Sequence, residues 1–263
     1  VAPAWSAAFA ALAVWLAWTY TTWVANWFDP DQLAVRLMLV AVMLASLAMS
    51  ASIPDAFGDR GLGFAGAFVA IHVGRTLFVL TALDRDNALT AHFRRVLCWT
   101  FMSAPLWLAG AFAERDVRIA LWLVAVVLDL TAPMFGFRVP GLGRDRTRDL
   151  RIEGGHLAHR YYLFVILALG ESILVIGATF SQLPVSGSRI AAFVIAFLGS
   201  VALWEIYFAR SEAGGHRAMT ATDDAARLGH WAYIAFHLPL VAGVIAIAAG
   251  DEQTIAHPTD PAT

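Results

Sequence analysis

The chain alternates between long apolar runs and short polar interruptions, and eight of the runs are long enough to be membrane-spanning helices. An α-helix rises about 1.5 Å per residue, so about 20 residues cross a hydrocarbon core about 30 Å thick. The predicted spans cover about residues 3–25, 33–53, 61–83, 96–112, 117–137, 156–180, 189–209 and 228–249. The fourth is short and interrupted by Pro105. This pattern predicts an all-α, polytopic integral membrane protein, with a single helical bundle over residues 1–250 and a polar tail over 251–263.

Composition supports the membrane class and excludes several other functions. Hydrophobic residues make up 59% of the chain and charged residues 14%, and the mean hydropathy is +0.66. A soluble domain carries about a quarter charged residues. The net charge of −2 comes with no basic tract, so no nucleic-acid partner is indicated. The single cysteine, Cys98, excludes an internal disulfide framework. No phosphate-binding loop, nucleophile elbow or zinc-protease motif is present, so the sequence predicts no catalytic residues and no cofactor.

The distribution of arginines between the loops predicts the orientation in the membrane. With eight spans, the connections after the first, third, fifth and seventh share one side and contain most loop arginines, five of them within residues 138–151. Cytoplasmic loops are enriched in basic residues, so this side is predicted to be cytoplasmic. Val1 then faces outward, and we expect a further helix upstream of it.

The sixth predicted span contains one ionisable residue near its middle, Glu171. A charged side chain at that depth costs at least about 2.5 kcal/mol. Glu171 is therefore expected to be neutral, paired, or facing a wet cavity. Arg160 lies eleven residues earlier, about three helical turns, so both side chains project from one stripe of the helix roughly 16 Å apart. The stripe predicts a path for a solute or proton, from a basic entrance to a buried carboxylate; the alternative is a carboxylate bonded to a neighbouring helix.

The third predicted span carries His72 and Arg75 on one helical face. A guanidinium stays protonated, so it is costly to leave unpaired in a membrane. We therefore expect Arg75 inside the bundle, within salt-bridge distance of a carboxylate. Glu171 is the first choice of partner and Asp129 the second. The alternative for Arg75 is an extended side chain that reaches the membrane interface.

Three more ionisable residues are candidates for the same path. Asp129 and Glu205 lie nearer the ends of their spans, where a solvated position is an equal alternative. His237 precedes Pro239 by two residues, so it is expected either to relay protons or to bond a carbonyl freed by the proline.

His156 and His159 have the spacing of two metal ligands on a helix, and Glu212 and His216 are the residues that would complete such a site. Free histidines at a membrane boundary are commoner than metal ligands, so no metal site is predicted.

Three segments of this sequence resemble the bacterial low temperature requirement A family. They are WLAWTYTTWVANWFDP in the first span, HRYYLFVILALGESILVIGATF in the sixth and HLPLVAGV in the eighth. The resemblance implies a polytopic protein of the bacterial cytoplasmic membrane that is linked to growth in the cold. It implies no settled activity and no catalytic residues. Family members usually begin with a further helix containing an E-L-F-x-D-L-V-F type motif and continue beyond the position of Thr263, so we expect this chain to be a fragment.

Two classes of function follow from these patterns. The first is a transporter or channel for a small solute, ion or proton, with Glu171 in its path and Arg160, Arg75 and His237 as neighbours. The second is a non-transporting membrane protein, either a lipid-handling enzyme or an envelope factor for cold adaptation, whose buried charges hold helices together. The two predict different geometry. A path requires charged groups that are open to a ligand, whereas a structural role requires them to be dry and saturated with partners. The expected partners are the lipid bilayer and a small solute or ion.

Overall fold

The computed structural model describes residues 4–83, 87–146, 150, 152–209, 213–222, 224–229, 232, 234 and 236–258. These residues form helices and no strand, with one isolated backbone bridge between Val139 and Gly143. The all-α prediction is confirmed. The chain divides into two compact units, Val1–Ile152 and Glu153–Thr263, and each is described by itself. The prediction of a single bundle concerns how the two units sit together, and it stays a prediction.

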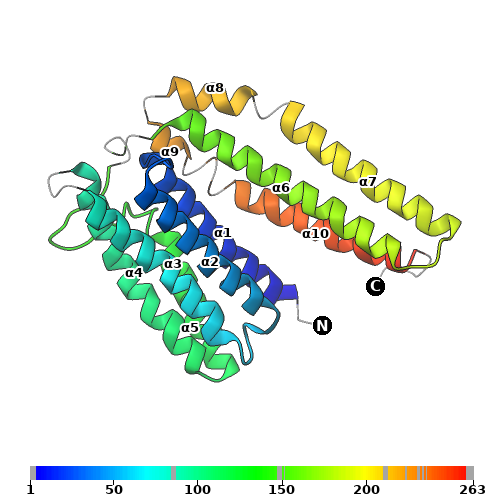
Figure 1. The fold of residues 1–263 in the computed structure, drawn as a ribbon, viewed down its shortest axis with the longest axis horizontal. Coiled ribbons are helices and arrows are strands. Elements are labelled where there is room, and N and C mark those ends of the chain that lie inside the picture. Colours follow the sequence, from blue (N-terminus) through cyan, green and yellow to red (C-terminus); the bar gives the residue numbers. More distant parts are fainter. Residues whose placement is uncertain are drawn as a thin grey trace. The chain divides into compact units, whose positions relative to one another are not determined.

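The first unit contains five long helices and one short 3-10 turn (Figure 1). They are α1 (Ala4–Trp27), α2 (Leu33–Ser52), the turn Ile53–Asp55, α3 (Gly61–Ala82), α4 (Ala88–Phe112) and α5 (Arg115–Thr131). From α2 to α5, each helix packs against the next along the chain, and α1 packs against α3 and α5. The short connections make consecutive helices antiparallel, so four of the five helices can contribute side chains to one interior.

An aromatic core fills that interior. Phe9, Phe64, Phe68, Trp107 and Trp122 are all buried. The rings of Phe68 and Trp107 lie 4.4 Å apart, and those of Trp107 and Trp122 lie 5.5 Å apart. Large aromatic side chains bury much apolar area and restrict how their helices can slide. This core fixes α1, α3, α4 and α5 around the polar residues described below.

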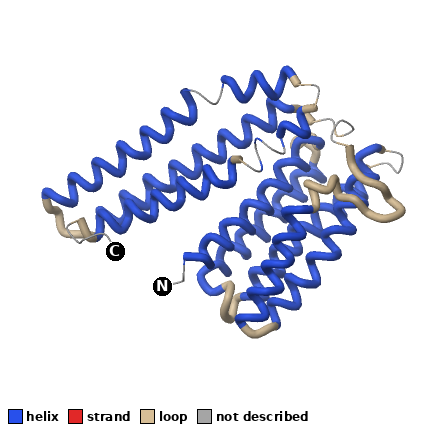
Figure 2. The backbone as a smooth tube through the Cα atoms, turned by 180° about the vertical axis from the view of Figure 1, so that it is seen from behind, coloured by secondary structure: helices blue, strands red, loops and turns tan. Residues whose placement is uncertain are grey.

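The second unit is built around α6, the longest helix of the described residues. It comprises α6 (Gly154–Ser181), α7 (Gly187–Tyr207), α8 (Ala213–Ala221), α9 (Ala225–Gly229) and α10 (His237–Ala256). α6 packs against the other four, and α7 also packs against α10; Figure 2 shows the backbone of these helices from behind. Ile176, Ala196 and Ile255 form a buried contact between the three long helices.

Six helices of the described residues are long and apolar enough to cross a membrane: α1, α2, α3, α6, α7 and α10. α2 exposes Leu37, Met43, Leu44 and Leu47, each at least 60% accessible, which is a surface suited to lipid. α4 carries two consecutive arginines and α5 has 17 residues with charges at both ends. The predicted number of eight spans stays a prediction for α4 and α5.

The structure corrects the bounds of several predicted helices. α4 is neither short nor interrupted: it runs for 25 residues with Pro105 inside it, and packing on α3 and α5 supports it where the proline removes a backbone bond. Asn87 begins it, since its side chain accepts a hydrogen bond from the Leu89 amide at 2.9 Å. α10 begins at His237, later than predicted, and continues through residues 251–256, which were assigned to the polar tail. α5 ends at Thr131, six residues earlier than the predicted span.

Candidate functional site

Polar residues from four helices meet at the centre of the first unit, beside the aromatic core. We call this group the inner cluster. Its members are Tyr20 and Thr21 from α1, His72 and Arg75 from α3, Trp107 from α4 and Asp129 from α5. Three of the residues singled out in the sequence, His72, Arg75 and Asp129, are thus brought together.

Arg75 lies inside the bundle, with 2% of its surface exposed. Its Nη1 donates hydrogen bonds to Thr21 Oγ1 at 2.8 Å and to the Ala17 carbonyl at 3.4 Å. Its guanidinium carbon lies 5.6 Å from the centre of the Tyr20 ring, within range of a cation–π interaction. Its Nε has no hydrogen-bond partner among the described residues. Only neutral groups therefore contact this charge in the described part of the chain.

His72 is 5% exposed and lies one helical turn before Arg75. Its ring is 4.3 Å from Phe68 and 5.2 Å from Tyr20, measured between ring centres. Within the described residues its Nε2 makes no hydrogen bond. Tyr20 thus contacts both His72 and Arg75, and two nitrogens on consecutive turns of α3 have unused hydrogen-bonding capacity.

Asp129 occupies the other side of Tyr20. Its Oδ2 accepts a hydrogen bond from Trp107 Nε1 at 3.1 Å, and its backbone carbonyl accepts one from the Tyr20 hydroxyl at 3.0 Å. Asp129 and Arg75 both contact Tyr20 and do not form an ion pair, so the predicted Arg75–Asp129 salt bridge is wrong. The first choice, Glu171, belongs to the second unit, and that pairing stays a prediction.

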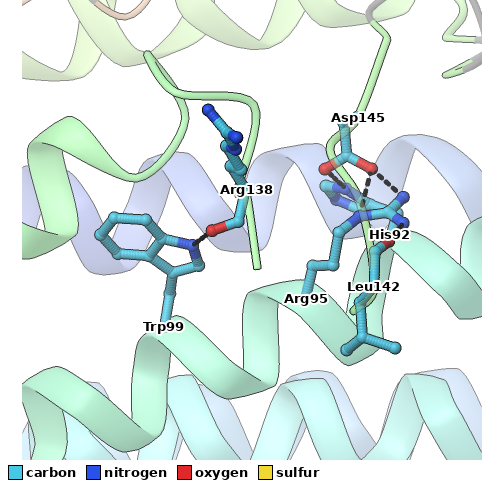
Figure 3. A network of polar contacts seen from close by, with 6 residues as sticks. All are labelled: His92, Arg95, Trp99, Arg138, Leu142 and Asp145. Atoms are coloured by element: carbon cyan, nitrogen blue, oxygen red, sulfur yellow. Dashed lines mark hydrogen bonds and ion pairs between the residues drawn. The ribbon is translucent and has the colours of Figure 1, made fainter. Parts of the chain in front are cut away.

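A second polar group, which we call the outer cluster, joins α4 to the segment after α5 (Figure 3). Asp145 Oδ2 lies 2.7 Å from His92 Nδ1, and Asp145 Oδ1 accepts hydrogen bonds from Nε and Nη2 of Arg95. Arg95 Nη1 also donates to the Leu142 carbonyl at 2.9 Å. Burial tends to raise the pKa of Asp145, but the bonds from His92 and Arg95 outweigh it and hold that pKa below its ordinary 3.8.

Phe137 lies between the two clusters. Its ring centre is 6.4 Å from that of Tyr20 in the inner cluster and 5.4 Å from that of His92 in the outer cluster. Its φ of 47° is in the left-handed region, which is rare for a bulky residue and costs of order 1–3 kcal/mol. The next carbonyl, that of Arg138, accepts a hydrogen bond from Trp99 Nε1 at 3.2 Å (Figure 3). One buried aromatic side chain on strained backbone therefore separates the clusters.

Arg118 shows a different use of a buried arginine. It is 9% exposed and donates to five backbone carbonyls. Its Nε and Nη2 bond the end of α4, and its Nη1 bonds the Gly58 carbonyl at 2.6 Å and the Ala56 carbonyl at 3.3 Å in the turn before α3. Arg118 therefore ties two connections of the first unit together.

In the second unit, Glu171 lies exposed on α6, between the exposed side chains of Leu167 and Leu174 on the same face. It makes no hydrogen bond or ion pair with the described residues. Glu205 is likewise exposed on α7. Arg160 is half-buried and donates from Nε to His156 Nε2 at 3.0 Å. Arg160 and Glu171 both belong to α6, and the path predicted along this helix stays a prediction.

His237 is held at the start of α10 by two hydrogen bonds. Its Nδ1 lies 2.8 Å from the Ala232 carbonyl, and its Nε2 lies 2.8 Å from the Tyr207 hydroxyl. A carbonyl oxygen only accepts, so Nδ1 carries the hydrogen, and in the neutral imidazole Nε2 accepts from Tyr207. The ring of Tyr161 is 5.4 Å away. His237 thus connects α6, α7 and α10 within this unit.

Among the described residues, no three His, Cys, Asp or Glu side chains lie close enough together to hold a metal ion. Glu212 and the side chain of His216 lie outside the described residues.

Sequence reasoning missed Tyr20 and Trp107, which connect the inner cluster. The aromatics of the first span include interior residues, since Trp15 is 2% exposed. The available signal was a run of four hydroxyl-bearing residues, Thr19 to Thr22, within an apolar helix.

The apolar helices and the buried polar clusters define a polytopic α-helical membrane protein. The chain belongs to the bacterial low temperature requirement A family, whose sequence model matches residues 3–263. It is 39% identical over 251 residues to a protein of Rhizobium meliloti (strain 1021) that is described as uncharacterized. That match covers 94% of this chain and 60% of the relative, so the chain spans about 60% of the relative's length. No solved structure matches.

Proposed function

We propose that this protein is a transporter or channel for a small solute or ion in the bacterial cytoplasmic membrane, and that its path passes through the inner cluster. The observation that carries the proposal is Arg75, a buried cation in an apolar bundle without a carboxylate partner among the described residues. Charged residues inside membrane proteins are costly, and they usually mark substrate or ion paths.

The alternative, a non-transporting protein whose charges hold helices together, predicts saturated side chains. Arg118 fits that description, because all three of its nitrogens donate to backbone carbonyls. Arg75 does not fit it, because only Nη1 is hydrogen-bonded to described residues and Nε is unused. The same unit therefore contains one arginine suited to structure and another suited to binding.

The outer cluster is the proposed entrance to this path. It lies at the end of the first unit from which residues 138–145 project, on the side predicted to be cytoplasmic. Between it and the inner cluster stands the ring of Phe137. An aromatic side chain on strained backbone is suited to separate the two groups in one conformation and to admit a solute in another.

A flux assay tests the proposal. The purified protein is reconstituted in proteoliposomes and tested with a panel of ions and small solutes. We expect Arg75→Gln to lower the flux of the transported species by at least about tenfold, because a buried hydrogen bond to a charged group contributes about 1.5–3 kcal/mol. Arg115→Gln removes the same charge from an exposed position and should leave flux unchanged. Absence of flux for every solute, or full flux in folded Arg75→Gln, would overturn the proposal.

The role proposed for Glu171 is tested on the same vesicles. Glu171→Gln keeps the size and hydrogen-bonding capacity of the side chain and removes its charge. If Glu171 takes part in the path, the variant inserts and folds with normal yield but loses flux. A structural role gives the reverse result: flux per folded molecule stays normal, and any loss appears in yield or thermal stability.

A further inference from the structure

Two side chains on consecutive turns of α3 present unused nitrogens at the centre of the first unit. His72 and Arg75 are three residues apart, so they share one helical face. Both contact the Tyr20 ring, at 5.2 Å between ring centres and at 5.6 Å from the guanidinium carbon. Neither His72 Nε2 nor Arg75 Nε is hydrogen-bonded to a described residue, and both are buried. Buried polar atoms of this kind normally have a partner, so two of them on consecutive turns of one helix face, each beside the Tyr20 ring, point to a ligand.

The charge at this place decides the class of ligand. A guanidinium remains protonated in proteins, and the groups that contact Arg75 are a hydroxyl, a carbonyl and an aromatic ring, all neutral. The carboxylate of Asp129 is bonded to Trp107 and makes no ion pair with Arg75. No carboxylate of the described residues therefore lies in direct contact with this positive charge. A cation would be repelled here, whereas an anion would be attracted by the charge and bonded by two N–H groups.

We propose that His72 and Arg75 bind a small monovalent anion, the size of chloride or nitrate, which accepts hydrogen bonds from Arg75 Nε and from His72 Nε2 in its protonated tautomer. The bound anion would supply the negative charge in direct contact with the guanidinium that no described carboxylate supplies. The proposal deepens the proposed function, on which it rests for its biological meaning, by assigning the solute class of the path. It differs from that function in requiring only binding, which can be measured without a membrane potential or a vesicle.

The surroundings favour a small anion over a large one. Phe68 covers one face of the His72 ring at 4.3 Å, and the Tyr20 ring covers both donors from α1. Thr21 and the Ala17 carbonyl occupy Nη1 of the guanidinium. An anion that bridges both Nη atoms, as a bulky carboxylate or phosphate does, would have to displace these bonds, whereas a small anion bound at Nε leaves them in place.

Thermal unfolding of the intact chain in detergent tests the proposal. The unfolding midpoint is measured at fixed pH, with one sodium concentration and one ionic strength, while gluconate is replaced stepwise by chloride or nitrate. A ligand that binds only the folded state stabilises it by RT ln(1 + [L]/Kd). We expect a saturable rise of the midpoint with chloride or nitrate, and none with gluconate.

Variants assign the effect to the cluster. Arg75→Gln should abolish the rise, and the exposed Arg115→Gln should retain it. His72→Phe preserves the aromatic contacts with Phe68 and Tyr20 and leaves Arg75 in place; it should increase the half-saturating concentration about tenfold or more. If Arg75→Gln does not fold, His72→Phe decides the question.

Two results would overturn the anion site: equal midpoints in chloride, nitrate and gluconate, or an anion effect that is unchanged in folded Arg75→Gln and in His72→Phe. The outcome is separable from that of the flux assay. Saturable binding without flux supports the site and removes the transport function, whereas flux of an uncharged or cationic solute without anion binding supports transport and removes the site.

Discussion

Gly61 allows Arg118 to reach the carbonyls that it bonds. A β-carbon built at Gly61 would lie 2.8 Å from the guanidinium carbon of Arg118 and 3.1 Å from the Ala56 carbonyl oxygen. The end of an arginine side chain usually moves away cheaply, but here it is fixed by five carbonyls on two sides. At this one position the absence of a side chain therefore supports a hydrogen-bond network.

We predict that Gly61→Ala destabilises the folded protein by about 1–3 kcal/mol, because the guanidinium must leave part of its network and buried carbonyls lose their donors. The measurement is the thermal unfolding midpoint in detergent. Gly66→Ala, on the same helix with no heavy atom within 4 Å of the added β-carbon, is the matched control. It should leave stability unchanged or raise it by up to about 1 kcal/mol, since alanine favours helix. Equal effects in the two variants would contradict the role given to Gly61.

For single residues, the sequence predicts which side chains are buried better than it predicts which residues they contact. The cost of a charge in an apolar helix correctly placed Arg75 inside the bundle. Its contacts with Tyr20 and Thr21 depend on the rotation and depth of α1 relative to α3, which apolar periodicity does not determine. The same reasoning explains why the sequence does not predict the hydrogen bonds of Arg118: its position one turn into α5 looks interfacial until the turn before α3 is placed against it.

Among the elements, α4 depends on the segment that follows α5. Asp145 accepts hydrogen bonds from Arg95 and lies 2.7 Å from His92 Nδ1, so it connects residues 138–145 to the helix (Figure 3). The bonds hold the pKa of Asp145 below its ordinary 3.8 despite partial burial. A carboxyl whose pKa is lower in the folded state stabilises that state above its unfolded pKa, and the stabilisation is lost as pH falls through the folded pKa.

We therefore predict that Asp145→Asn lowers the unfolding midpoint at neutral pH, and that the difference from the unmodified chain stays constant down to about pH 4. Below that pH the difference should shrink, because both chains then carry a neutral side chain at this position. His92 and Arg95 are the side chains that face Asp145, and both remain in the two proteins. The measurement is a series of midpoints between pH 2 and 7. A difference that grows on acidification would contradict the assignment.

Helix positions followed from the apolar pattern more reliably than helix ends did. α4 extends eight residues before its predicted start because Asn87 caps it, and Arg94 and Arg95 belong to the helix although they interrupt the apolar run. α10 begins later than predicted, at the histidine that bonds Tyr207 and Ala232. Capping residues and tertiary hydrogen bonds set these helix ends, and neither can be predicted from hydropathy.

For the whole molecule, membership in a membrane-protein family agrees with six helices long and apolar enough to span a bilayer. The division into two units was not anticipated, because an apolar pattern does not say which helices pack together. The antiparallel succession from α2 to α5 places the connections before α4 and after α5 at one end of the first unit, and those before α3 and before α5 at the other.

The arginine distribution then predicts that the end carrying residues 138–146 faces the cytoplasm. Cysteine labelling tests this in a chain whose own cysteine is replaced, Cys98→Ser. Arg146→Cys introduces a thiol at an exposed position of that segment, and Glu114→Cys introduces one between α4 and α5 at the opposite end. In intact cells, a membrane-impermeant maleimide should label Glu114→Cys and not Arg146→Cys, and permeabilisation should make the latter reactive. The proposed entrance at the outer cluster would then open to the cytoplasm. Labelling of Arg146→Cys from outside would contradict this orientation. It would place the proposed entrance on the external face, where a solute taken up by the cell would first meet it.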